Sequence, residues 1–99
     1  MPAIARKTDS VSTGHACTGS TTLNTPSQST VFVEGQLVAC QGDPTVSHTV
    51  LVGDDCVPHV EFINGATSSV KIGGISAAKV GDGCDAGSIT SGASSVFIG

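Results

Sequence analysis

The sequence predicts a mainly β protein built from short hairpins, and three observations support this fold class. The segment Val31–Ala39 has two short, β-branched runs on either side of a turn in which Gly35 tolerates a positive φ. A similar pattern returns 39 positions later, and no part of the chain shows a convincing helical period. Because 99 residues allow one domain, we expect a single domain over residues 1–99.

The repeat has two full copies and two partial ones. Thr30–Val33 matches Ser69–Ile72, and Cys40–Asp43 matches Lys79–Asp82. The chain closes on a partial copy, Ser95–Gly99, and its beginning carries another. That first copy, Ala5–Asp9, resembles Ala78–Asp82 with Thr8 in place of glycine. We therefore expect the first and last segments to be the two halves of one split hairpin.

A further strand pair is expected around Asn64-Gly65, which is a strong hairpin signal. It would run through His59–Ile63 and return through Ser68–Val70. The remaining stretches are rich in Gly, Ser, Thr and Asp and are predicted to be loops; they are Ser10–Ser29, Pro44–Pro58 and Gly83–Ser94.

The composition predicts a thin core and excludes some partners. Phe32, Phe62 and Phe97 are the only aromatic residues, so we expect a disulfide, a metal or a partner subunit to add stability. The net charge of −4 repels phosphate backbones, which argues against nucleic acid as a partner. No apolar run is long enough for a signal peptide or a membrane span, so stable membrane insertion is not expected. In the cytosol the four cysteines would be reduced, which favours metal binding over disulfides.

The histidines suggest a metal site. His15, His48 and His59 each lie in or beside a predicted loop, and Cys84 occupies the equivalent stretch after the second full copy. If the repeats are arranged around an axis, these loops converge at one end. Three imidazoles and one thiolate suit tetrahedral Zn²⁺, with iron as the competing metal. Since four protein donors leave no open position, such a site is structural rather than catalytic.

Other interpretations of these residues remain open. Cys17 or Cys56 could replace Cys84 as the sulfur ligand, because each has a histidine two or three residues away. The histidines could also be polar loop residues that hold no metal. Cys40 is expected to be a partly buried thiol. The aspartates that follow glycine at the repeated strand ends are expected to fix turns, and no motif argues for a catalytic nucleophile.

The segment Ser76–Asp82 resembles the Pro-Ala-Ala-Arg motif, followed by a hydrophobic residue, Gly and Asp, of the PAAR family of spike-tip proteins, with Ser in place of Pro and Lys in place of Arg. The likeness extends to the Ala5–Asp9 segment, His15, the repeated hairpins and the terminal Ser95–Gly99. It implies a single cone-shaped domain of short hairpins with pseudo-threefold symmetry and a zinc site near the apex. Carried over by position, the ligands would be His15, His48, His59 and Cys84.

The resemblance also implies a function. The chain would be a non-enzymatic cap, one per trimer, on the blunt end of a trimeric β-helical spike, and it would sharpen that spike for penetration of a target cell envelope. The host would be a contractile phage tail, with the cap at the virion tail tip and its baseplate, or a type VI secretion system. In the second case the cap would be made in the bacterial cytoplasm and exported with a valine-glycine-rich spike.

Several details follow from this expectation. Ending at Gly99, the chain is expected to carry no effector extension. The alternatives are an adaptor or receptor-binding module on the spike and, less simply, a small zinc hydrolase with an open coordination position. Six strand residues are expected in the core or at the spike-facing base: Val31, Val33, Val70, Ile72, Val96 and Ile98.

Overall fold

Ten short strands and no helix make up the fold in the computed structural model, which describes all 99 residues. The mainly β fold class predicted from the sequence is therefore confirmed. The strands are β1 (Ser10–Ser12), β2 (Ser20–Thr22), β3 (Phe32–Val33), β4 (Gln36–Leu37), β5 (His48–Val52), β6 (Asp55–His59), β7 (Lys71–Ile72), β8 (Ile75–Ser76), β9 (Gly83–Cys84) and β10 (Gly87–Ile89).

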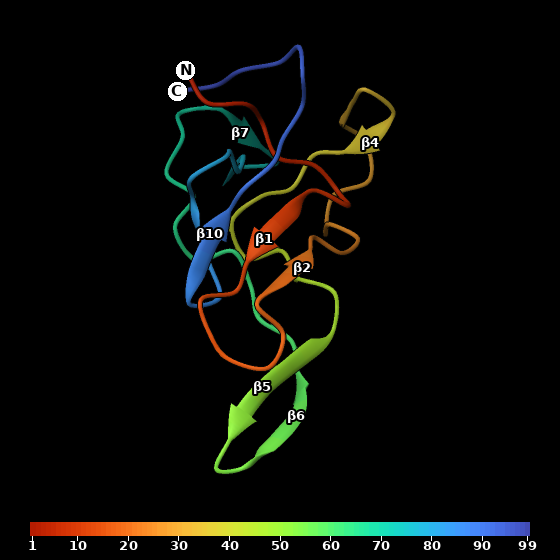
Figure 1. The fold of residues 1–99 in the computed structure, drawn as a ribbon. Coiled ribbons are helices and arrows are strands. Elements are labelled where there is room, and N and C mark those ends of the chain that lie inside the picture. Colours follow the sequence, from red (N-terminus) through yellow and green to blue (C-terminus); the bar gives the residue numbers. More distant parts are fainter.

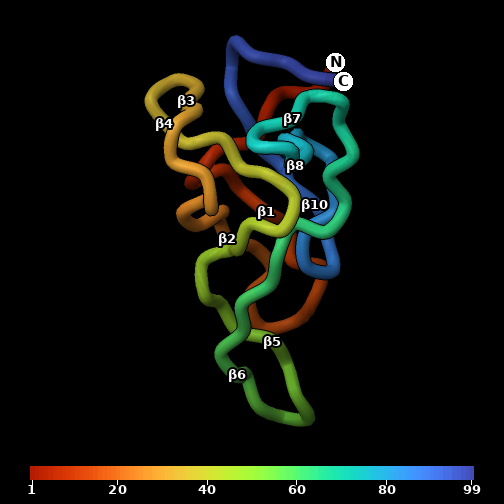
Figure 2. Tube along the Cα trace, turned by 180° about the vertical axis from the view of Figure 1, so that it is seen from behind, coloured from red at the N-terminus to blue at the C-terminus, as the bar shows by residue number.

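The strands form one four-stranded sheet, in the order β2-β1-β10-β9, and three separate hairpins, β3–β4, β5–β6 and β7–β8, all antiparallel. The molecule is elongated, with extents of 41 × 24 × 21 Å. Both chain termini lie at its broad end together with β3–β4 and β7–β8, and the β5–β6 hairpin projects from the opposite, narrow end (Figures 1 and 2).

The two repeated hairpins form where the sequence predicts them. In β3–β4 the turn residues Glu34 and Gly35 have φ of 53° and 81°, and in β7–β8 Gly73 and Gly74 have φ of 60° and 86°. Two positive φ values characterise the mirror-image turn whose twist matches that of the flanking strands. Glycine supplies this conformation without strain, whereas Glu34 adopts it in spite of its side chain.

The two chain ends pair as predicted, but through residues 2–4 and not through Ala5–Asp9. Ala3 pairs with Phe97 in an antiparallel bridge. The amide of Ile4 donates to the carbonyl of Val96, and the amide of Ile98 donates to that of Pro2, both at 2.9 Å. The pairing of the two ends completes the broad end of the molecule (Figure 1).

One kind of tight turn occurs three times along the chain. In each copy an aspartate side chain accepts a hydrogen bond from the backbone amide three residues earlier, and the residue before the aspartate has a positive φ. This is the turn-fixing role expected for these aspartates. The bonds run from Arg6, Cys40 and Lys79 to Asp9, Asp43 and Asp82, at 2.7, 2.7 and 2.9 Å.

These three turns are joined in a closed ring through one buried alanine of each copy. The amide of Ala5 donates to the carbonyl of Ala78, that of Ala78 to Ala39, and that of Ala39 to Ala5, at 2.9, 2.8 and 3.0 Å. All three alanines are fully buried. Their small side chains allow the three backbones to approach closely enough to form these hydrogen bonds. The main core cluster surrounds the ring and also contains Val11, Leu23, Ile63, Ala66, Cys84 and Ile89.

Two local predictions were wrong. The polar stretches that we predicted to be loops contain β1, β2, β5, β6, β9 and β10. The expected strand pair around Asn64-Gly65 does not form, because both residues donate their amides to the carbonyl of Gly83 instead. A Cβ on Gly65 would lie 2.8 Å from the nitrogen of Gly83, so glycine serves close backbone approach here and not a hairpin turn.

The predicted base residues divide into two groups. Ile98 belongs to a second core cluster, and Val33, Ile72 and Val96 pack against that cluster. Val31 and Val70 are instead exposed in the single chain, by 38% and 40%. This second cluster is built on Ile4, Val38, Ala77, Ala93 and Ile98.

Glu34 ties the first repeated hairpin to the C-terminal segment. Its carboxylate accepts hydrogen bonds from the hydroxyls and amides of Ser94 and Ser95 and pairs with Arg6 at 2.8 Å. The hydrogen bonds, led by the Ser95 hydroxyl, lower the pKa of Glu34 from 4.5 to about 2.

This shift predicts a pH dependence of stability. A carboxylate with a lowered folded-state pKa stabilises the fold above its unfolded value of 4.5, and that contribution is lost as the pH falls from 4.5 toward 2. Glu34→Gln should therefore lower the thermal midpoint by a few degrees at pH 7 and by much less at pH 2, where the carboxyl is already partly protonated. Equal losses at both pH values, measured by circular dichroism, would contradict the assignment.

Candidate metal centre

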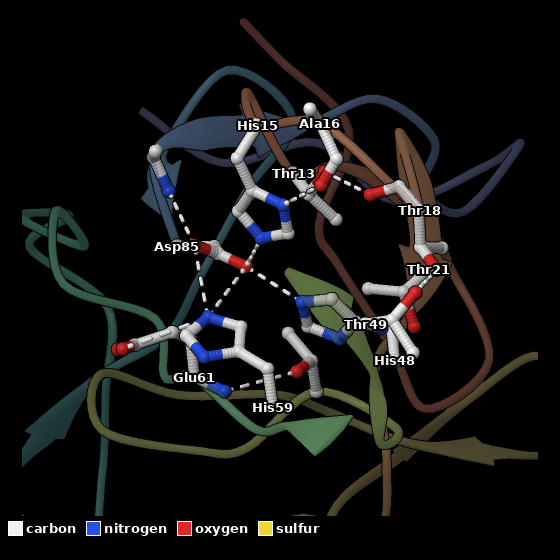
Figure 3. A network of polar contacts seen from close by, with 12 residues as sticks. Thr13, His15, Ala16, Thr18, Thr21, His48, Thr49, His59, Glu61 and Asp85 are labelled. Atoms are coloured by element: carbon white, nitrogen blue, oxygen red, sulfur yellow. Dashed lines mark hydrogen bonds and ion pairs between the residues drawn. The ribbon is translucent and has the colours of Figure 1, made fainter. Parts of the chain in front are cut away.

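Three separate parts of the chain bring the histidines together. His15 lies in the loop between β1 and β2, while His48 begins β5 and His59 ends β6. His48 and His59 are directly paired across the β5–β6 ladder, so they stand side by side at the root of the projecting hairpin. All three predicted histidine ligands thus meet in one group (Figure 3), beside the root of this hairpin.

The three imidazole rings surround one carboxylate, that of Asp85. Their centroids lie 5.0 to 5.2 Å apart. The Nε2 atoms of His15, His48 and His59 are 2.9, 2.8 and 3.5 Å from Asp85 Oδ2. The potential ligand atoms of the four residues all lie within 4.8 Å of one another. Such a group of three imidazoles and one carboxylate can hold a metal ion.

Hydrogen bonds on the far side of two rings fix which nitrogen faces the carboxylate. His15 Nδ1 lies 3.2 Å from the carbonyl oxygen of Ala16, and His48 Nδ1 lies 2.9 Å from that of Val46. A carbonyl can only accept, so we assign the proton of each neutral ring to Nδ1. Each Nε2 then directs a lone pair toward the carboxylate of Asp85. Two acceptors facing each other are repulsive unless a cation, either a proton or a metal ion, lies between them.

The pKa shifts of His15 and Asp85 reflect the same contacts. Burial alone would lower the pKa of His15, but its hydrogen bonds to Ala16 and Asp85 outweigh burial and raise the pKa. Burial likewise opposes ionisation of Asp85, yet its hydrogen bonds with the three imidazoles, which donate from Nε2 when that nitrogen is protonated, lower its pKa. The site therefore keeps a carboxylate anion next to the three imidazole rings.

Asp85 is held in place by its backbone conformation and by two hydrogen bonds. It is the first residue of the two-residue turn between β9 and β10, with a φ of 57°. Its side chain accepts the amide of Ala86 at 2.8 Å, and its carbonyl accepts the side-chain amide of Asn64 at 3.0 Å. A non-glycine residue in this left-handed region is uncommon, and such positions concentrate at functional sites.

The fourth donor differs from the expected one. Cys84 immediately precedes Asp85, but its side chain is fully buried in the main core cluster and is not part of the histidine group. Burial, reinforced by the nearby carboxylates of Asp85 and Glu61, raises the pKa of this thiol to about 11, so it stays protonated at neutral pH. The residues of a strand alternate in direction, and here the alternation points the thiol into the core.

The other cysteines are also not members of the group. Cys17 and Cys56 form a disulfide, which overturns the expectation that all four cysteines are reduced, and neither can replace Cys84 as a thiolate ligand in this state. Cys40 is free and buried, as expected, and burial raises its pKa to about 11.

The sequence prediction did not include Asp85 among the ligands, because the spacing of the histidines and cysteines favoured its neighbour Cys84. The signal for it in the sequence is local: an aspartate at a two-residue turn between glycines, in Gly83-Cys84-Asp85-Ala86-Gly87. Aspartate is one of the few residues that tolerates the left-handed conformation of this turn.

No family model and no curated protein match this chain. No helix of the protein is both long enough and apolar enough to cross a membrane.

Proposed function

We propose that this protein is a metal-stabilised structural cap for the blunt end of a trimeric β-helical spike, as its motifs suggest, and that it is not an enzyme. The observation that carries the metal part is the cluster in which three Nε2 atoms converge on one carboxylate. His15, His48, His59 and Asp85 would hold Zn²⁺, with iron as the alternative.

Bound metal would supply a cross-link between three parts of the chain that are distant in the sequence. It would join the β1–β2 loop, the root of the β5–β6 hairpin and the β9–β10 turn, which provide His15, the His48–His59 pair and Asp85. Four protein donors complete a tetrahedral set, which is the signature of structural zinc rather than catalytic zinc. Metal binding would then contribute directly to folding free energy.

The broad end supports the docking part of the proposal. It carries β3, β7, β8 and both chain termini (Figures 1 and 2). An apolar cap suits an open β-helix end, which presents unpaired strand backbone and interior side chains. The closed ring of three similar turns is also compatible with a partner made of three chains. The exposed apolar side chains of this end belong to Met1, Val31, Phe32, Val70, Ile75 and Phe97.

A binding experiment with a matched control tests the docking face. Phe32 and Phe97, exposed by 58% and 51%, are changed to serine, and the control is Val52→Ser on the projecting hairpin, where the exposure is also 58%. We expect the double variant to bind a purified trimeric β-helical spike about tenfold or more weakly and the control to bind normally. If the wild-type protein bound equally well to the intact spike and to a spike that lacks its terminal strands, this result would contradict capping.

A second function is favoured by the projecting hairpin. The end of β5–β6 exposes the apolar side chains of Leu51 and Val52. On an assembled spike this hairpin would point away from the spike, so it could serve as an adaptor or receptor-binding element. In that case the Val52→Ser change, and not the Phe32 and Phe97 changes, would weaken binding of the receptor or cargo.

A further inference from the structure

The Cys17–Cys56 disulfide joins the two elements that carry the histidines. Cys17 lies two residues after His15 in the β1–β2 loop, and Cys56 lies in β6, three residues before His59. Cys17 also pairs with Val50 of β5 in an isolated bridge. The covalent link therefore fixes the loop that bears one imidazole against the hairpin that bears the other two.

Apart from the disulfide and the Cys17–Val50 bridge, Thr18 and Thr49 connect this loop to the hairpin, and the amide of Thr49 donates to the hydroxyl of Thr18 at 3.1 Å. Thr18 donates its amide to the carbonyl of Thr49 at 3.2 Å, and the two hydroxyls share a hydrogen bond of 2.6 Å. Cys17 itself has a φ of 79°, a left-handed conformation that costs a non-glycine residue free energy. Breaking the covalent link would leave only non-covalent contacts to hold this loop, and with it His15, against the hairpin.

The disulfide is also accessible to reductants. Both Cys17 and Cys56 are exposed, unlike the two free cysteines, which are buried. Exposed disulfides are the ones that thiols reduce most readily, because a thiolate can reach either sulfur.

We propose that the Cys17–Cys56 disulfide and metal binding at His15, His48, His59 and Asp85 are thermodynamically coupled, so that reduction of the disulfide weakens the hold on the metal. The inference rests on the proposed metal centre. In the redox step two glutathione thiols lose two electrons and two protons and form glutathione disulfide. The Cys17–Cys56 disulfide accepts these two electrons and two protons, its S–S bond breaks, and two cysteine thiols form. The protein would hold its metal most tightly in an oxidising environment.

The sign of the coupling follows from preorganisation. In the oxidised protein, His15 is already next to His48 and His59, so the metal does not have to order the loop. In the reduced protein, part of the binding free energy is spent on that ordering. Couplings of this kind typically change affinity by about 5-fold to 150-fold. By reciprocity, bound metal must make the disulfide harder to reduce by the same factor, and a tenfold change corresponds to about 30 mV.

The opposite sign is the competing outcome. If the freed thiols of Cys17 and Cys56 joined the imidazoles as thiolate ligands, reduction would strengthen zinc binding, because thiolates are strong zinc ligands. A variant that lacks both sulfurs separates these cases. In Cys17→Ser/Cys56→Ser the link is absent and no thiolate can replace it.

The first measurement is zinc affinity, determined by competition with a chromophoric chelator without reductant. We expect the oxidised wild type to bind zinc about tenfold or more tightly than Cys17→Ser/Cys56→Ser. The matched control is Cys40→Ser, which removes a cysteine that is not in the disulfide and should retain wild-type affinity. Equal affinities of wild type and double variant would overturn the coupling and leave the metal centre standing. Absence of zinc binding by the wild type would overturn the metal centre and the coupling with it.

The second measurement uses the wild-type chain and does not depend on folding of the double variant. The reduction potential of the disulfide is measured in glutathione buffers, with free zinc either absent or held constant by a chelator. We expect zinc to shift the potential to a more negative value by about 30 mV or more, the conversion of a tenfold coupling. No shift, or a shift to a more positive value, would overturn the proposal.

Discussion

Replacing His48 by alanine is expected to abolish stoichiometric zinc binding and to lower the thermal midpoint of the zinc-loaded protein by about 10 °C or more. His48 is the most buried of the three rings, with 2% of its side chain exposed, and it lies 2.8 Å from Asp85. Loss of one ligand from a structural site removes binding free energy that is also folding free energy. Elemental analysis and a melting curve on the same sample measure both effects.

The metal-free proteins provide the control for this prediction. Since His48 also fills space, its removal should cost some stability without any metal. The difference between the melting points of loaded and metal-free protein should be large for the wild type and close to zero for His48→Ala. If the variant retained one zinc per chain and the full difference, His48 would not be a ligand.

Asp85→Asn and Cys84→Ser together are expected to identify the fourth donor. Asparagine keeps the shape of aspartate and also tolerates the positive φ of 57°, so this change removes mainly the negative charge. We expect zinc affinity to fall by at least about 100-fold in Asp85→Asn. Loss of a residue that only hydrogen-bonds to a metal ligand already lowers affinity by about 10-fold to 100-fold, and loss of a ligand should cost more. Cys84→Ser should retain wild-type zinc affinity and lose stability, because it places a hydroxyl in the core.

The opposite pattern would restore the original expectation. If Cys84→Ser lost zinc and Asp85→Asn kept it, the thiol would have to turn out of the core and ionise when metal binds. A competition assay with a chelator of known affinity measures both variants under the same conditions.

The features of the fold that depend on nearby residues could be predicted from the sequence. The turns at Glu34-Gly35 and Gly73-Gly74 are set by the residues that adopt a positive φ, and the repeated aspartates fix their turns through bonds that span three residues. The pairing of the two chain ends was predictable because they carry parts of a pattern that is complete elsewhere.

Features that depend on distant contacts could not be predicted in the same way. β5 and β6 look like a loop in sequence, because the turn residues Gly53 and Asp54 separate them and Pro58 interrupts β6. At Asn64-Gly65 the local preference for a hairpin is overridden by pairing with Gly83, which no spacing rule indicates. The convergence of the histidines was predictable from their positions relative to the repeats.

The identity of the fourth donor was not predictable, because it depends on which of two adjacent side chains faces the core. The strand direction of Cys84 is fixed by the partners of β9, which lie in β10 and at Ile63. A shift of one residue in this pairing would exchange the roles of Cys84 and Asp85.

X-ray absorption spectroscopy at the zinc edge tests the central claim most directly, because it distinguishes sulfur from nitrogen and oxygen ligands. For the protein loaded with one zinc ion, the His15, His48, His59 and Asp85 centre predicts a first shell of nitrogen and oxygen only, at about 2.0 to 2.2 Å. A sulfur neighbour at about 2.3 Å would contradict it and assign the fourth position to a cysteine.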